Sequence, residues 1–260
     1  MTRLIIKLET PPGFVLKNDL LKAADDLGYR IDEGLHGAWH KRASTTARGS
    51  IFLAGEGSDG PWYLGIENEA IAEELNFVSV EFDGLEFAYF QFESLNALRI
   101  GIDRAYKLGV SLPSAPLDAF LKAAEGKPQN TEVERLVVQR IGQAQFRKAL
   151  LDYWDGSCCV TGIRDTHLLR ASHIKPWSRC DSDAERLDVH NGLLLSALWD
   201  AAFDKGLVTF DENMRAVFSP NLSKTAKHTL ESTAAPILYN MTEKHAQYLD
   251  WHRKFLFIKS

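Results

Sequence analysis

Residues 171–176 read Ala-Ser-His-Ile-Lys-Pro, and residues 191–206 read Asn-Gly-Leu-Leu-Leu-Ser-Ala-Leu-Trp-Asp-Ala-Ala-Phe-Asp-Lys-Gly. The first stretch predicts a short strand that ends at Pro176, because proline cannot donate to a sheet ladder. After a polar interval expected to be an ordered loop, the second stretch predicts a strand over 193–195. A helix with Ser196 as its N-cap should follow. The pattern places Leu198, Ala202 and Phe203 on one face of this helix.

Six blocks of sequence follow one another in the second half of the chain. They are Arg140–Gln143, Phe146–Trp154, Cys158–Gly162, Leu168–Trp177, Asn191–Leu195 and Phe203–Phe210. In this order they resemble the HNH, or ββα-metal, endonucleases associated with bacterial restriction, over roughly residues 130–255. A single His-Ile-x-Pro motif arises by chance in many proteins, whereas six ordered blocks are specific.

The resemblance implies metal-dependent hydrolysis of phosphodiester bonds and gives each motif residue a role. His173 would be the general base that deprotonates water, and Asp200 would bind a divalent cation. Asn191 would hold the histidine ring or contribute its carbonyl oxygen to the metal. The expected catalytic residues are therefore His173, Asn191 and Asp200, of which Asp200 and Asn191 are also expected metal ligands.

Two departures from the wider HNH pattern affect the expected cation. Many members carry an acidic ligand immediately before the histidine base, where this chain has Ser172, a poor ligand for a hard cation. Many also place a third histidine on the helix, at the position of Asp200. A carboxylate there favours Mg²⁺ or Mn²⁺. Substrate oxygens and water would complete the shell, unless His190 or Asp188 helps.

The cysteines argue against the zinc site that braces many HNH domains through two Cys-x-x-Cys pairs. Cys158 has Thr161 at its partner position, and the second pair is replaced by Ser196 and Trp199. No structural zinc is therefore expected. Three cysteines in total, an odd number, also suit a reducing compartment, so a cytoplasmic location is expected.

Length and composition indicate an ordinary globular chain of two domains. It has 260 residues, of which 45% are hydrophobic and 25% charged. Pro and Gly near residues 112–116 and 126–130 predict a hinge around a short helix at 117–125. We therefore expect domains at residues 1–125 and 126–260, the first for DNA recognition or regulation and the second for HNH endonuclease activity. The expected fold class is α+β, with a small α+β domain followed by a ββα-metal domain with flanking helices.

Neither membrane insertion nor secretion is indicated by the hydropathy pattern. No stretch approaches the roughly 18 apolar residues of a membrane span. The opening residues 1–7 are too soon interrupted by charge to be expected as a secretory signal.

The charge pattern does not indicate a protein that binds DNA through net charge alone. The formal net charge is −5, with an acidic first half and a slightly basic second half. Local basic groups would then contact phosphates. The expected DNA contacts from the second half are Arg147, Arg170, Lys175 and Arg179, with Arg140 and Lys148 as further candidates.

The first half resembles no family that we recognise. Its patterns predict strands at 3–8, 51–54, 63–66 and 78–82, and helices at 18–27 and 94–108. The segment 36–48 combines aromatic, histidine and basic residues and reads as a polar loop. Such a loop could stack on or read a DNA base through Trp39 and Arg42, or it could be a plain exposed loop with one core tryptophan.

Three functions remain open from the sequence. The first is a metal-dependent DNA endonuclease of a restriction or modification-dependent defence system, with N-terminal target recognition. The second is an effector-like or toxin-like nuclease whose N-terminal domain binds a protein or a small signal. The third is a DNA-binding module without activity, since Ser172 replaces an acid. A homodimer is expected for the nuclease, because one ββα site holds one phosphodiester at a time.

Overall fold

The computed structural model describes residues 6–82, 87–128, 130–233 and 238–259. The chain forms two compact units, Met1–Val110 and Ser111–Ser260, each of which is considered by itself. Within the described residues, we find no helix with the length and apolar character needed to cross a membrane.

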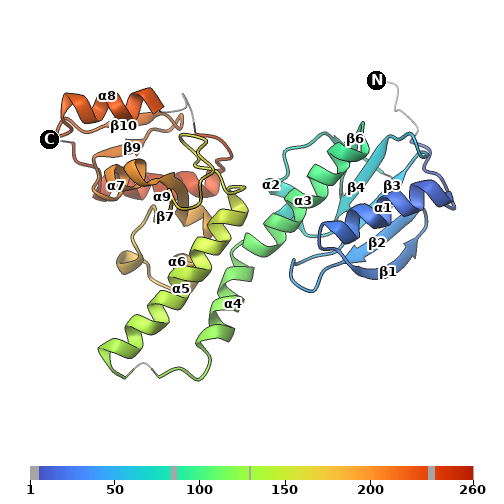
Figure 1. Ribbon diagram of the computed structural model, residues 1–260, viewed down its shortest axis with the longest axis horizontal. Coiled ribbons are helices and arrows are strands. Elements are labelled where there is room, and N and C mark those ends of the chain that lie inside the picture. The colour runs from blue at the N-terminus through green and yellow to red at the C-terminus, as the bar shows by residue number, and fades with distance from the viewer. Residues whose placement is uncertain (1–5, 83–86, 129, 234–237, 260) are drawn as a thin grey trace. The chain divides into compact units, whose positions relative to one another are not determined.

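The first unit is a six-stranded antiparallel sheet with helices (Figure 1). Its strand order is β1-β2-β3-β4-β6-β5. The strands are β1 (Ile31–His36), β2 (Trp39–Ala43), β3 (Ile51–Gly55), β4 (Trp62–Ile66), β5 (Ser79–Val80) and β6 (Ala88–Phe92). The helices are α1 (Phe14–Asp26), α2 (Glu69–Glu74) and α3 (Leu95–Ser111).

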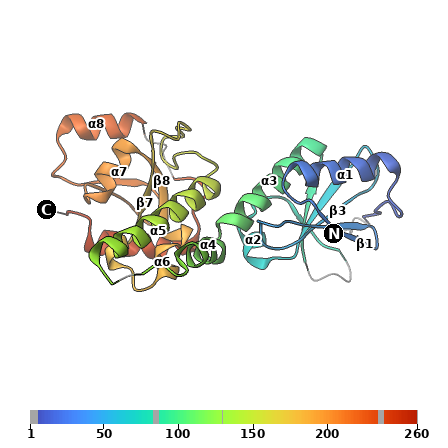
Figure 2. The same ribbon diagram turned by 60° about the horizontal axis from the view of Figure 1, so that its bottom comes forward.

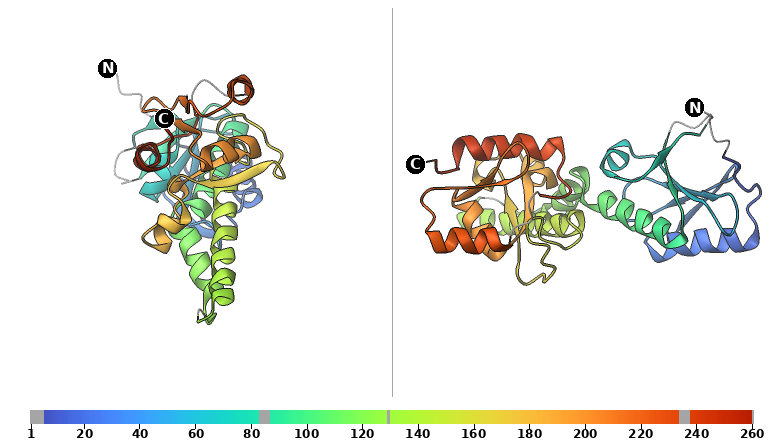
Figure 3. Two further views of the ribbon diagram at one scale, coloured as in Figure 1. Left: turned by 90° about the vertical axis from the view of Figure 1, so that its left-hand side faces the viewer. Right: turned by 90° about the horizontal axis from the view of Figure 1, so that it is seen from above.

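Both faces of this sheet are covered by apolar side chains. Helices α1 and α3 lie along one face, as the view from above shows (Figure 3). The opposite face carries an aromatic cluster, because alternate residues of a strand point to the same side. The buried members of this cluster are Trp39, Phe52, Ala54, Tyr63 and Tyr89.

Several expectations for the first unit need correction. The predicted polar loop at 36–48 is wrong for its centre, which is strand β2. The strand expected at 78–82 is reduced to two residues in β5, and the helix expected from Asn18 already begins at Phe14. The strand expected at 3–8 lies partly outside the described residues, and its described part, 6–8, is not a strand.

The second unit is built around an antiparallel pair of strands followed by a helix, so the fold class of the chain is α+β as expected. Strand β7 (Leu169–His173) pairs with β8 (Gly192–Ser196), and α7 (Ala197–Asp204) follows directly. Short helices η1 (Trp177–Arg179), α6 (Asp183–Arg186) and η2 (Val189–Asn191) order the loop between the strands. The remaining elements are α4 (Ser114–Ala124), α5 (Glu132–Tyr153), β9 (Val208–Phe210), β10 (Ala216–Phe218), α8 (Lys224–Thr233) and α9 (Glu243–Phe255).

The division between the units lies before the boundary expected at residue 126. Helix α4 packs against α5 and therefore belongs to the second compact unit. Figure 2 shows the two helices within that unit. The assignment of recognition and cleavage to separate domains stays a prediction.

Candidate active site

The ββα motif presents its residues on two different faces of the β7–β8 pair. His173 lies opposite Gly192 in the register, and Ser172 lies opposite Leu193. Because strand side chains alternate, His173 and Ser172 point to opposite sides of the strand. They are the last two residues of β7, so His173 and the Ser172–Asp200 contact lie at the same end of the hairpin. Helix α5 covers the side of His173, and α7 covers the side of Ser172.

The ring of His173 is held from three directions. Phe146 of α5 stacks on it with ring centroids 3.8 Å apart and an interplanar angle of 16°. Trp177 meets it edge to face at 5.6 Å. The backbone carbonyl oxygen of Arg186 lies 2.8 Å from His173 Nε2. A glycine at 192 permits this packing, since a Cβ there would lie 2.6 Å from Phe146 Cζ.

These contacts determine which nitrogen of His173 can act as a base. A carbonyl oxygen only accepts hydrogen bonds, so Nε2 must carry the proton and donate it to Arg186 O. The lone pair is then on Nδ1. Burial lowers the pKa of His173 to about 4, against the opposing effect of the Arg186 hydrogen bond. The imidazole is therefore neutral at physiological pH and able to accept a proton at Nδ1.

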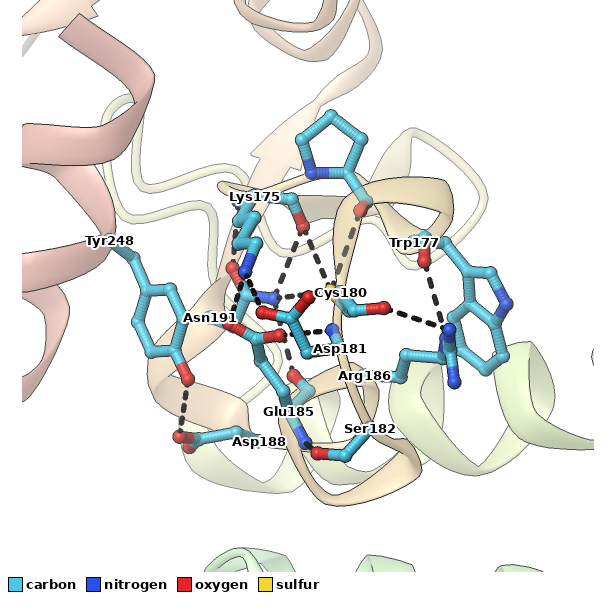
Figure 4. A network of polar contacts seen from close by, with 11 residues as sticks. Lys175, Trp177, Cys180, Asp181, Ser182, Glu185, Arg186, Asp188, Asn191 and Tyr248 are labelled. Carbon is cyan, nitrogen blue, oxygen red and sulfur yellow. Dashed lines mark hydrogen bonds and ion pairs between the residues drawn. The ribbon is translucent and has the colours of Figure 1, made fainter. Parts of the chain in front are cut away.

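Asn191 fixes the loop that follows His173 (Figure 4). Its side-chain oxygen accepts from Lys175 N at 2.8 Å, and its amide donates to Lys175 O at 3.1 Å. The same amide contacts Glu185 O at 3.2 Å and Cys180 Sγ at 3.4 Å. The side chain is completely buried. Asn191 therefore positions the chain after His173, and its expected role as a metal ligand stays a prediction.

The charged residues of the loop 175–188 pair mainly with one another, as Figure 4 shows. Lys175 Nζ lies 2.9 Å from Asp181 and 2.8 Å from Glu185, and hydrogen bonds to these carboxylates raise its pKa. The Arg186 guanidinium donates to the carbonyl oxygens of Trp177 and Cys180. These contacts hold the carbonyl of Arg186 in place against His173.

Asp188 and His190, considered as further metal ligands, are instead engaged with each other. Asp188 Oδ1 lies 2.8 Å from His190 Nδ1, and its other oxygen accepts from Tyr248 Oη at 3.1 Å. Burial opposes a charge on Asp188, but the hydrogen bond from His190 and its other partners hold its pKa below the usual value. This pair ties the loop to α9.

Asp200 lies on the other side of the hairpin, with Ser172. Burial raises its pKa, and this effect is partly offset by a hydrogen bond from the Ser172 hydroxyl. The nearby carboxylate of Asp204 raises the pKa further, and Arg170 lowers it. A half-buried carboxylate with a raised pKa gains stability when a cation binds beside it.

The donors around Asp200 fit a hard divalent cation of the kind that HNH nucleases use. Asp200 would hold the ion through its carboxylate oxygens, which hard cations prefer, and the Ser172 hydroxyl positions that carboxylate by its hydrogen bond. Among the residues that the structure describes, no three side chains of the His, Cys, Asp and Glu types come together as a metal site. Such a cation would stabilise the negative charge that develops on the phosphate.

The thiol of Cys158 accepts hydrogen bonds from the backbone of residues at the zinc-ligand positions of other HNH domains. Its Sγ accepts from Ser196 N at 3.1 Å and from Thr161 N at 3.4 Å. These are two of the positions that replace zinc ligands in the sequence comparison. The thiol thus connects the segment before β7 to the end of β8, and the expectation of no structural zinc stays a prediction.

The basic residues expected to contact phosphate differ in their surroundings. Arg147 donates to the carbonyl oxygens of Leu169 and Thr166, at 2.9 Å each, and so supports β7. Lys175 is occupied by its two carboxylates. Arg170 and Arg179 are exposed. Arg170 donates to the carbonyl oxygens of His167 and Leu169 from an exposed position, and it also lies near Asp200. Of these four residues, Arg170 and Arg179 are best placed to meet DNA.

The two expected DNA contacts in the first unit have structural partners. Trp39 is buried among Tyr63, Phe82 and Tyr89, which leaves no ring face for a base. Arg42 is buried and pairs with Asp25 and Asp32. The structure gives no support for base recognition by these two residues, because the segment is a core strand and not an exposed loop.

The positioning residues could be found from the sequence only in part. Phe146 belongs to one of the ordered blocks, but nothing in the sequence near Phe146 predicts its contact with His173. The Arg186 contact uses a backbone oxygen, which any residue type would supply. The sequence indicates that Ser172 is a weak ligand, but its hydrogen bond to Asp200 depends on the packing of α7 against β7.

Comparison with known families agrees with this geometry. Residues 158–211 match the family model described as HNH endonuclease. The matched segment contains β7, β8 and α7, and with them His173, Asn191 and Asp200. The chain therefore contains an HNH endonuclease domain, which is a phosphodiester hydrolase acting on nucleic acid. No curated protein matches the chain.

Proposed function

We propose that this protein is a DNA endonuclease of a restriction or modification-dependent defence system, dependent on Mg²⁺ or Mn²⁺. The main support for this chemistry is the hydrogen bond between His173 Nε2 and the carbonyl oxygen of Arg186. It leaves Nδ1 as the nitrogen that can act as the base. Asp200, held by a hydrogen bond from Ser172, would supply carboxylate oxygens for the cation. A second copy of the chain belongs to the same proposal, because cutting a duplex requires two hydrolytic events.

In this mechanism the chain's own residues position His173 and accept one proton from the attacking water. His173 Nδ1 accepts a proton from the attacking water, and the Arg186 carbonyl stabilises the imidazolium that results. Asn191 keeps the chain after His173 at a fixed distance from α6. Arg170 and Arg179 would contact phosphates and so position the duplex.

The target class is proposed from the order of the sequence blocks, which resembles restriction-associated nucleases. Selection of the target is assigned to the first unit, which lacks the nuclease motif. The acidic character of residues 1–125 favours the second candidate, an effector-like nuclease whose first unit binds a protein or a small signal. The internal pairing of Arg42 also favours this candidate.

One digestion experiment separates these functions. Unmodified, methylated and hydroxymethylated DNA and single-stranded RNA are incubated with the purified protein and Mg²⁺ or Mn²⁺, without added zinc. Discrete fragments from one class of DNA would support the defence enzyme, whereas indiscriminate degradation would support the effector. Resistance of all substrates under every metal condition would contradict both.

The same preparation tests the proposed cofactor. Chelation should abolish cleavage, and Mg²⁺ or Mn²⁺ alone should restore it. Elemental analysis of the purified protein should find less than one zinc per chain. Stoichiometric, tightly bound zinc would contradict the interpretation of Cys158.

A further inference from the structure

The first half of α5 presents apolar residues on two opposite sides. Together with α4 it forms a helical hairpin that extends from the ββα core of the second unit (Figures 1 and 3). One side of α5 is buried through Val138, Gly142 and Phe146. The other side exposes Val133, Leu136 and Val137.

The exposed side chains form a continuous stripe. Val133, Leu136 and Val137 are 70%, 47% and 45% exposed. Spacings of three and four residues place them next to one another on the helix surface. A helix that is apolar on both sides is normally covered on both sides. The structure of this unit therefore leaves a surface of α5 without a partner.

The charged residues on the two sides of the stripe have opposite signs, so they could pair with the same residues of a second copy. Glu132 precedes Leu136 by four residues, and Arg140 follows it by four. Both side chains are exposed, and neither has an ion pair in the described part of the chain. Each lies about 6 Å from Leu136 along the helix axis. In an antiparallel pair of α5 helices with Leu136 on the two-fold axis, Glu132 of each copy lies level with Arg140 of the other.

We propose that this face of α5, formed by Glu132, Val133, Leu136, Val137 and Arg140, is the dimer interface and that a second copy of the chain covers it. The two α5 helices run antiparallel, with apolar contacts at the centre and two Glu132–Arg140 ion pairs at the flanks. The face contains neither His173 nor Asp200, so the proposal stands apart from the chemistry of the site.

Helix α5 would also connect the interface to the two sites. Phe146, which stacks on His173, follows Leu136 by ten residues on the same helix. Ten residues span about 15 Å, so the two His173 sites would be on the order of 30 Å apart along the paired axes. A single continuous helix in each copy would hold this separation.

Charge exchange tests the pairing directly in the full-length chain. Molecular mass is measured by sedimentation equilibrium for wild type, for E132R and for R140E. The wild type should be dimeric at tens of micromolar, and each variant should be monomeric there, since like charges then face each other. An equimolar mixture of the two variants should recover the dimer mass, as should the double variant E132R/R140E.

A second pair of variants tests the apolar stripe. Leu136→Ser should raise the dimer dissociation constant at least tenfold, whereas Ile100→Ser, at a 56% exposed helical position in the first unit, should leave it unchanged. Equal thermal midpoints for the monomeric forms would exclude misfolding as the cause. A monomeric wild type at all concentrations, including the case where the first unit covers the stripe, would overturn the proposal. Dimers that persist in both charge variants would overturn it too. Mass is independent of cleavage, so failure here is distinct from failure of the proposed activity.

Discussion

His252 shows how burial holds a histidine neutral away from the reacting groups. It stacks on Phe203 with centroids 4.0 Å apart and donates Nε2–H to the Phe203 carbonyl at 3.1 Å. Its Nδ1 accepts from the Thr209 hydroxyl at 2.9 Å. Burial lowers its pKa to about 4, as burial also does for His173. Each of the two histidines has a neutral, stacked ring, but only His173 lies in the HNH motif.

The lowered pKa of His252 predicts acid sensitivity of the fold. The unfolded chain binds a proton near pH 6.5 and the folded chain only near pH 4, so the stabilising effect is complete above pH 6.5 and is lost as the pH falls toward 4. At pH 5 this loss is about 2 kcal/mol for one histidine. Denaturant unfolding at pH 7.5 and pH 5.0 should show a smaller pH effect in His252→Gln than in wild type. The same pH effect in both proteins would disagree with a buried neutral histidine.

Helix α7 carries two carboxylates, Asp200 and Asp204, that differ in their surroundings and allow a controlled comparison. Asp200 is half-buried beside Ser172, whereas the side chain of Asp204 is 63% exposed and lies 3.6 Å from Lys205. Asp200→Asn should reduce metal-dependent cleavage by roughly 10²–10³-fold, because it removes the charge that would hold the cation. Asp204→Asn should stay close to wild type. Similar losses in the two variants, measured as initial rates at saturating Mg²⁺, would argue against Asp200 as the principal ligand.

At the level of elements, the ββα order was predictable because its signals are local. Pro176 predicts the end of the first strand, which ends at His173, and the run of leucines after Gly192 gives β8. The expected face of α7 was correct for Ala202 and Phe203 but wrong for Leu198, which is 51% exposed. Trp199 is buried there instead, since its indole donates to Thr233 of α8 and its ring stacks on Phe210. Both partners come from later segments, which the local period of the helix does not reveal.

Strand β2 was missed for a related reason. Its sequence contains His40, Lys41 and Arg42, which favour a solvated loop when considered alone. In the fold, carboxylates from other segments pair with Lys41 and Arg42, as Asp25 and Asp32 do with Arg42. Tertiary pairing of this kind overrides local polarity and cannot be derived from a single segment.

The side chain of Asn191 links η2 to the loop after β7. Asn191→Ala leaves the backbone N–H and carbonyl groups of Lys175 without these partners and should lower the free energy of unfolding by about 2 kcal/mol or more. Asn213→Ala, at an exposed position, is the control. Cleavage should fall and should not recover with excess Mg²⁺. Full recovery at high Mg²⁺ would instead indicate that Asn191 binds the cation.

At the scale of the whole molecule, the two compact units suggest a division of labour. All residues of the HNH motif lie in Ser111–Ser260. A fragment of residues 111–260 should remain folded and nick DNA with metal but lose target preference, because phosphate contacts position DNA without reading it. Cleavage maps of the fragment and the full chain on one plasmid provide the comparison. Identical maps would place recognition within the nuclease unit.

We assign His173 as the general base of the HNH domain, and its alanine variant tests this role in the intact protein. His173→Ala should reduce the rate of DNA cleavage by about 10²–10⁴-fold while DNA affinity stays within a few-fold of wild type. His252→Gln, which alters a buried histidine outside the motif, should retain cleavage at a pH where it is folded. The measurement is the single-turnover cleavage rate at saturating Mg²⁺, with binding measured in parallel in the presence of chelator. A near-complete loss of cleavage with binding retained is the predicted result, and a wild-type rate in His173→Ala would contradict the assignment.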